Sequence, residues 1–167
     1  MKRLCNLPPE KQYKKLLKRD IYFSPTTFIN VDTYKKLGGV STEVKNIEDT
    51  PLALMYTSNG YGLNFMDDYT VYYRIGDSVS HRRGTIYNQG HIIQTYIMKR
   101  TLIYPNISRF DIPYWYDEMV IRLRYFVILK LGNKDTIGLR AINNALRLLS
   151  ISAWRKLIET IWYHYCK

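Results

Sequence analysis

The apolar residues after position 111 recur at the spacing of α-helices, and this constrains the fold more than any other feature of the chain. The three stripes comprise Tyr116, Met119, Val120, Leu123, Phe126 and Val127; Leu139, Ile142, Leu146 and Leu149; and Trp154, Leu157, Ile158, Ile161 and Tyr165. We therefore predict three helices over residues 111–167.

Residues with helix-capping chemistry lie at the expected ends of these three helices. The first helix begins after Asp111 and Pro113, with Asp117 and Glu118 expected in its first turn. Gly132-Asn133 is expected to end it. The second helix begins at Asp135 or Thr136, and the third at Ser150 or Ser152, because short polar side chains cap helix N-termini.

The middle of the chain, residues 21–110, is rich in β-branched and aromatic residues punctuated by Gly, Asn, Asp and Pro, which is typical of strands and turns. The predicted strands are Leu52–Thr57, Tyr69–Ile75, Thr85–Asn88 and His91–Tyr104. Ser58-Asn59-Gly60 contains the Asn-Gly pair of a tight hairpin turn. We predict an antiparallel β region here.

The first 20 residues predict a short basic helix that begins at Pro8-Pro9-Glu10, since proline is favoured in a first helical turn. Leu16 and Leu17 give it an apolar side. The basic residues of this segment are candidates for nucleic-acid contact: Lys11, Lys14, Lys15, Lys18 and Arg19. A solvated helix face without a ligand is the simpler interpretation of the same pattern.

Together these patterns predict a single α+β domain, with a basic N-terminal helix (1–20), a β-rich part (21–110) and a helical part (111–167). The length of 167 residues and the 46% hydrophobic composition suit one packed core. Arg122, Arg124 and Lys130 interrupt the most apolar stretch, so we expect no membrane span. Cys5 and Cys166 do not form a disulfide framework, which favours a reducing compartment.

The net charge of +11 indicates attraction to polyanions such as nucleic acid or an anionic membrane. Residues 1–20 carry seven basic and two acidic residues, so the excess is concentrated there. The same charge also suits a component of a nucleic-acid-containing assembly that has no specific binding site.

The sequence offers no recognisable catalytic or metal-binding pattern. His81, His91 and His164 are far apart and lack metal-ligand spacing, and Asp67-Asp68 is interpreted as a turn. No phosphate-binding glycine loop, dinucleotide fingerprint or nucleophile elbow is present. We therefore expect a non-enzymatic protein with no cofactor and no metal.

The stretch Tyr72-Tyr73-Arg74-Ile75-Gly76 through Arg83 resembles the second motif of GIY-YIG nucleases, with Arg74 separating the tyrosine from Ile75-Gly76. The resemblance implies a degenerate nuclease. Beside the neighbouring tyrosines, Arg82 and Arg83 are also candidates for nucleic-acid contact, because basic and aromatic groups together bind single strands.

The segment Arg109-Phe110-Asp111-Ile112-Pro113 through Met119, leading into Arg122–Leu131, resembles a strand-to-helix passage in the adaptor proteins of short-tailed phages. These are the gatekeeper or tail-tubular ring proteins. The resemblance implies a ring or collar in the head-to-tail connector or tail, built from copies of the chain and other virion proteins. Its location would be the virion, and the host cytoplasm before assembly.

A ring of this kind buries aromatic and aliphatic surface between copies and presents basic residues to packaged DNA. The aromatic residues expected at the interface are Tyr114, Trp115, Trp154 and Trp162. The sequence thus favours a non-enzymatic structural protein of a phage virion, with no membrane partner. Its alternatives are a small DNA- or RNA-binding protein and a subunit of a ribosome-type particle.

Overall fold

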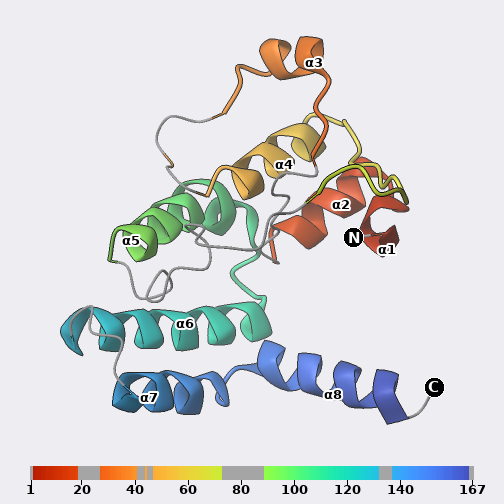
Figure 1. Cartoon of the computed structure of the whole chain (residues 1–167). Helices are drawn as coiled ribbons and strands as arrows, with labels where there is room; N and C mark the ends of the chain where they lie inside the picture. Colours follow the sequence, from red (N-terminus) through yellow and green to blue (C-terminus); the bar gives the residue numbers. More distant parts are fainter. Residues whose placement is uncertain are drawn as a thin grey trace. The chain divides into compact units, whose positions relative to one another are not determined.

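The computed structural model describes residues 2–18, 27–40, 44, 47–72, 89–131 and 137–165 (Figure 1). These residues form eight α-helices and no β-strand. The helices are α1 (Lys2–Cys5), α2 (Pro9–Leu16), α3 (Val31–Lys36), α4 (Asp49–Ser58), α5 (Gln89–Met98), α6 (Ile112–Leu131), α7 (Ile137–Arg147) and α8 (Ile151–Tyr165). A π-helical turn, η3 (Lys99–Ile103), and a 3₁₀ turn, η4 (Tyr104–Asn106), follow α5.

The predicted α+β fold with an antiparallel β region is therefore wrong. Leu52–Thr57 lies within α4, and His91–Tyr104 forms most of α5 together with η3 and the start of η4. Residues 69–72 have no regular structure, and the predicted strand Thr85–Asn88 lies outside the described residues.

The buried residues of the 91–104 segment explain why it is helical. Ile92, Thr95, Met98, Lys99 and Ile103 are buried, and they recur every three or four residues. That is the period of a helix face and not the alternation of a strand. The β-branched and aromatic composition of the segment therefore does not determine its backbone conformation.

The predicted hairpin turn at Asn59-Gly60 is instead the end of α4. Gly60 adopts a positive φ of 83°, which costs an L side chain energy that glycine avoids. The amide of Gly60 donates to the carbonyl of Thr57 (3.3 Å), and the amide of Tyr61 donates to that of Tyr56 (3.0 Å). This pair of bonds is the Schellman motif that ends many helices, so the Asn-Gly pair terminates a helix here.

The chain divides into two compact units, each built from two separate stretches of sequence. Unit 1 comprises Met1–Gly76 and Ile93–Ile107, and unit 2 comprises Asp77–Ile92 and Ser108–Lys167.

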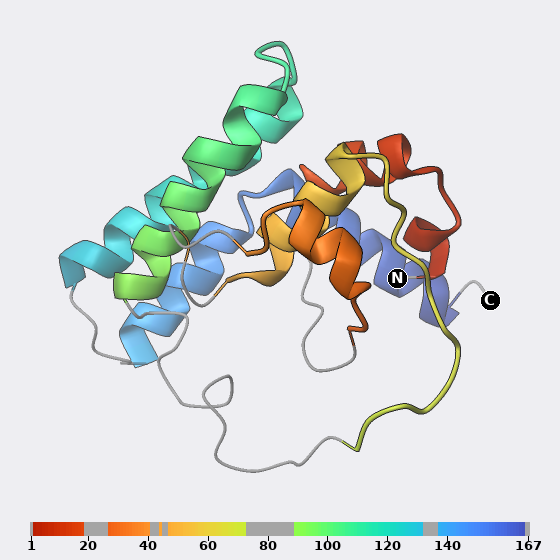
Figure 2. The same cartoon turned by 90° about the horizontal axis from the view of Figure 1, so that it is seen from above.

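In unit 1, α2 packs against α4 (Figure 2), and one buried side chain ties α2 to the segment after α4. Gln12 is 1% exposed, and its side-chain amide both accepts and donates hydrogen bonds. Its Oε1 accepts a hydrogen bond from the backbone amide of Leu63 (2.7 Å), while its Nε2 donates to the carbonyl of the same residue (3.1 Å). Nε2 also donates to the carbonyls of Leu7 (2.8 Å) and Cys5 (3.3 Å). Gln12 therefore joins three separate backbone segments.

In unit 2, the three helices predicted over residues 111–167 are present, and α6 packs against α7 and against α8. Ile92 and Ile128 form a small buried cluster with Tyr125 and Val127 packed on it. Helix α6 begins at Ile112, so Asp117 lies in its second turn and not in its first.

The carboxylate of Asp117 fixes the start of α8. It accepts hydrogen bonds from the backbone amides of Ile151 (2.6 Å) and Ser152 (2.9 Å) and from the hydroxyl of Ser150 (2.9 Å). Ser150 Oγ in turn accepts from the amide of Ala153 (3.4 Å), which confirms Ser150 as the N-terminal cap of α8. A negative charge at a helix N-terminus also complements the helix dipole.

No helix within the described ranges combines the length and the apolar character needed to cross a lipid bilayer.

We predict that Gln12→Ala lowers the free energy of unfolding by about 2–3 kcal/mol, because it leaves buried backbone groups without partners. Urea denaturation followed by circular dichroism measures this change. Lys11→Ala, at an exposed neighbouring position of α2, is the matched control and should change stability by less than about 0.5 kcal/mol. Equal losses for the two variants would contradict the role assigned to the amide.

We predict that Asp117→Ala loosens the first turn of α8 by about 1–2 kcal/mol, since three hydrogen bonds to that turn are lost. Hydrogen–deuterium exchange at the amides of Ile151 and Ser152 should become at least about fivefold faster. Glu159→Ala, an exposed acid in the middle of α8, is the control and should leave these two amides unchanged. Unchanged exchange in Asp117→Ala would show that the cap does not hold α8.

Candidate interaction surfaces

The predicted nucleic-acid residues of the N-terminal segment form one exposed stripe. Lys11, Lys14, Lys15 and Lys18 are all exposed, and their spacing of three, four and seven residues places them on one side of α2 and its C-terminal turn. The opposite side carries the buried Gln12 and Leu16. We call these four residues the lysine stripe.

One acid lies beside the lysine stripe. Lys14 Nζ donates a hydrogen bond to Glu10 Oε1 at 2.8 Å, in an exposed pair. This hydrogen bond, together with the positive charge, lowers the pKa of the Glu10 carboxyl. Exposed pairs of this kind contribute little to stability, so Lys14 can exchange Glu10 for a phosphate. Arg19, Arg82 and Arg83, the other predicted contacts, lie outside the described residues.

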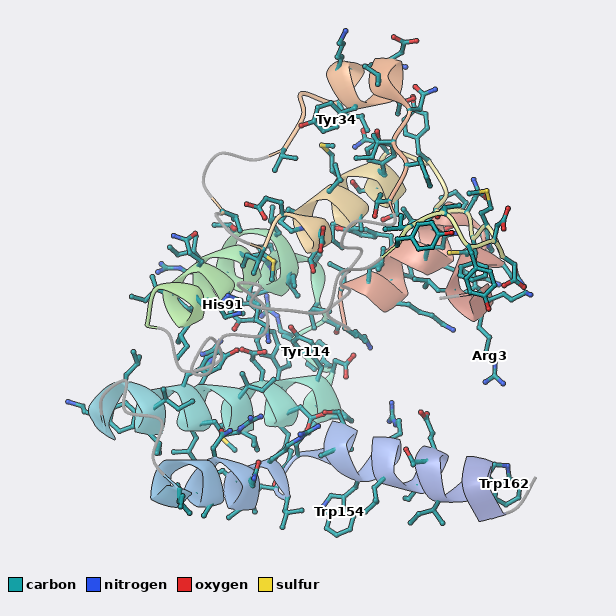
Figure 3. The ribbon with its side chains drawn as sticks, viewed as in Figure 1. Arg3, Tyr34, His91, Tyr114, Trp154 and Trp162 are labelled. Atoms are coloured by element: carbon teal, nitrogen blue, oxygen red, sulfur yellow. The ribbon has the colours of Figure 1, made fainter. Side chains whose placement is uncertain are left out.

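Helix α8 presents an apolar stripe to solvent. Trp154, Leu157, Ile158, Ile161 and Trp162 recur at helical spacing on one side of α8 and are between 46% and 66% exposed. We call these five residues the α8 stripe. Figures 1 and 2 show α8 diverging from α6 beyond its first turns, and Figure 3 shows Trp154 on the side of α8 that faces away from α6. Helix α6 therefore does not cover the α8 stripe.

The other two aromatic residues predicted at the interface, Tyr114 and Trp115, make contacts within unit 2. Tyr114 and Trp115 are half-buried and meet edge to face, with ring centroids 5.3 Å apart. The indole Nε1 of Trp115 donates to the carbonyl of Ser108 (2.9 Å). Figure 3 shows Tyr114 on the side of α6 opposite to α8. The structure thus does not bring Tyr114 and Trp115 together with Trp154 and Trp162.

A groove of about 1090 Å³ opens on unit 1. Its walls come from residues 27–33, from one face of α4, and from the extended segment 60–71. Large apolar and aromatic side chains line it, and several of them are substantially exposed: Phe28, Ile29, Phe65, Met66, Tyr69 and Val71. We call this hollow the aromatic groove.

The formal charges that line the aromatic groove within the described ranges are those of Asp67 and Asp68, and no Lys or Arg lines it there. Asp67 pairs with Lys2 at 2.7 Å in an exposed contact outside the groove lining. Asp68 accepts a hydrogen bond from the amide of Tyr69 (2.7 Å). Because Lys2 pairs with Asp67, Asp68 is the formal charge of the described lining that favours a cationic group in an occupant.

Burial raises the pKa values of two side chains that line the aromatic groove, Cys5 and Tyr56. Desolvation raises the pKa of the Cys5 thiol, which makes it a poorer nucleophile at neutral pH. Desolvation also raises the pKa of Tyr56, and the neighbouring Tyr34 and Tyr61 add to this shift. The Tyr56 hydroxyl donates to the carbonyl of Asn30 (3.2 Å). No group of His, Cys, Asp and Glu within the described part of the chain could hold a metal ion.

Sequence patterns indicated the residues of the α8 stripe but not their exposure. Leu157, Ile158 and Ile161 form a helical apolar face in the sequence, and such a face usually packs into a core. The aromatic groove had no comparable signal, because its residues come from three separate segments. Asp67-Asp68 predicts a turn, and this pattern gives no sign of a groove.

Comparison with known proteins adds no functional assignment, because no family model, no curated protein and no solved structure matches this chain.

We predict that Lys11→Gln combined with Lys15→Gln weakens the binding of nucleic acid. The slope of log affinity against log salt should fall by about 0.9 for each lysine that contacts a phosphate of duplex DNA. Fluorescence anisotropy with a labelled duplex at several salt concentrations measures this slope. The control is Lys35→Gln with Lys36→Gln, an equal charge change on the exposed face of α3. Equal slopes for the two double variants would contradict a specific role for the lysine stripe.

Proposed function

We propose that this protein is a non-enzymatic assembly protein that associates with copies of itself through the α8 stripe and faces nucleic acid with the lysine stripe. The observation that carries the proposal is the exposed apolar side of α8. Monomeric proteins rarely leave large contiguous apolar patches in water, and such patches usually mark protein interfaces. The two tryptophans strengthen this interpretation, because tryptophan is enriched among the residues that contribute most to binding.

Unit 2 as a whole supports the proposal. Most of the exposed large apolar residues of the described chain belong to its three helices, whereas Ile92, Val120 and Ile128 are its buried apolar residues within those ranges. Fully burying one large apolar side chain stabilises by roughly 1.5–3 kcal/mol. Covering the five half-exposed residues of the α8 stripe is therefore worth about 5 kcal/mol per copy.

Association itself costs about 4–15 kcal/mol in lost translational and rotational freedom. The α8 stripe therefore needs an apolar surface opposite it, and contact with a polar partner would not suffice. A second copy of the chain supplies such a surface at the same concentration as the stripe.

The narrower form of the proposal places this assembly in the head-to-tail connector or tail of a phage virion. It rests on the resemblance of residues 109–131 to short-tailed phage adaptors and on the positive charge of the chain, which suits contact with packaged DNA. The helical structure of residues 91–106 differs from the strand that precedes the helix in the passage this segment resembles.

A monomeric DNA- or RNA-binding factor is the second candidate, and the lysine stripe favours it. In that case binding would be strongly salt-dependent, and the chain would not assemble without nucleic acid. The stretch that resembles GIY-YIG nucleases lies almost entirely outside the described residues.

We predict that Ile158→Glu combined with Trp162→Glu converts the nuclease-treated protein from a complex of several copies to a single chain of 19.9 kDa. Glutamate is a good helix former, so α8 itself should persist. Light scattering coupled to gel filtration measures the mass, in low salt and in 1 M salt. The wild-type complex should persist in 1 M salt, because apolar contacts are not screened by ions.

Ile112→Glu is the matched control, since Ile112 is 74% exposed at the start of α6 and lies outside the α8 stripe. It should retain the wild-type mass. If the α8 double variant kept the wild-type mass, or if the wild-type protein were a monomer, the proposal would be wrong.

A further inference from the structure

The aromatic groove of unit 1 is an exposed apolar surface, as the α8 stripe is. We propose that the aromatic groove receives the α8 stripe of the next copy, so that copies join head to tail. This inference rests on the proposed self-association and names the surface that α8 meets.

The shape of the groove suits a helix. Small-molecule sites usually measure about 300–1,000 Å³ and enclose their ligand, whereas this hollow of about 1090 Å³ is open and its lining side chains are exposed. Amphipathic helices dock into apolar grooves through residues spaced at i, i+3, i+4 and i+7. The α8 stripe has this spacing in Trp154, Leu157, Ile158 and Ile161.

The chemistry of the two surfaces is complementary. Aromatic and aliphatic side chains line the groove, and aromatic and aliphatic side chains make up the α8 stripe. Arg155 is exposed and borders the stripe by its helical position, while Asp68 lines the groove and Asp67 beside it is paired with Lys2.

The sequence of the C-terminal segment carries the same charge preference. Residues 151–167 contain Arg155, Lys156 and Lys167 against the single acid Glu159. Charge complementarity of this kind selects partners and orients them. Helix α8 thus combines an apolar stripe that α6 does not cover with a net positive sequence.

A contact between two different surfaces has a consequence for assembly. Each copy would donate α8 at one side and offer its groove at the other, which is a heterologous interface. Such interfaces close into rings when the rotation between copies allows it, and they form open filaments otherwise. A face-to-face pairing of two α8 helices would instead stop at a dimer.

Mixing two defective variants of the full chain tests the proposal. The first, Ile158→Glu with Trp162→Glu, has a damaged α8 and an intact groove. The second, Phe65→Asp, has an intact α8 and a damaged groove, because it places a charge on a groove side chain that is 44% exposed. Phe110→Asp is the matched control, since Phe110 is 84% exposed and lies outside both surfaces.

We expect each defective variant alone to sediment as a single chain and the Phe110→Asp control to assemble as the wild type does. An equimolar mixture of the two defective variants should form a complex of twice the chain mass, because one intact α8 then meets one intact groove. Circular dichroism of each variant shows whether it is folded. If Phe65→Asp unfolds, Asp68→Lys replaces it, and the same doubling of mass is expected.

Two results would overturn the head-to-tail contact. One is a folded Phe65→Asp variant that assembles as the wild type does, which would mean that α8 meets another surface while the proposed self-association stands. The other is a mixture of folded, defective variants that stays monomeric. If the wild-type protein is itself monomeric, the proposed function fails as well, so the two failures are distinguishable.

Discussion

The hydrogen bonds between Asp117 and the first turn of α8 determine which apolar surface this protein exposes. They fix the N-terminus of α8 to α6 at one point, through the amides of Ile151 and Ser152. Beyond that point α8 diverges from α6, and its apolar side has no cover from that helix (Figures 1 and 2). A helix with an apolar side is stable in water when that side is packed, so α8 requires a partner surface.

In unit 1, the two sides of the short helix α2 make different contacts. The amide of Gln12 ties the buried side of α2 to the backbone of Leu63, and the lysine stripe occupies the opposite side. Because the segment 60–71 is held in this way, its aromatic residues line the aromatic groove. One buried amide thus supports both the lysine stripe and the aromatic groove.

The sequence predicted the helices well where apolar residues recur at a single clear period. Helices α2, α6, α7 and α8 lie where the apolar stripes placed them, and Ser150 caps α8 as one of the two predicted residues. The predicted caps between α6 and α7 lie outside the described residues. The prediction failed where the amino-acid composition favoured strands but the spacing of the buried residues was helical. The segment 91–104 is rich in Ile, Thr and Tyr, yet its buried residues recur every three or four positions. Asn59-Gly60 has the chemistry of a hairpin turn and equally that of a helix end, and tertiary context decided between them.

The candidate surfaces could be predicted from the sequence where their residues share one helix. Lys11, Lys14, Lys15 and Lys18 share one helix, so their common exposure follows from spacing alone. The α8 stripe is visible in the sequence, but whether such a stripe is buried depends on helices elsewhere in the chain. The aromatic groove combines Phe28, Tyr56 and Phe65 from three segments, and no local pattern brings them together.

The central claim is that the apolar side of α8 is buried between copies, and hydroxyl-radical footprinting of the wild-type chain over a range of concentrations tests it most directly. The account predicts that labelling of Trp154 and Trp162 falls as concentration rises, while labelling of Tyr34 on α3 stays constant. Labelling of the two tryptophans that does not change with concentration would contradict it, because their exposure would then be a property of the single chain.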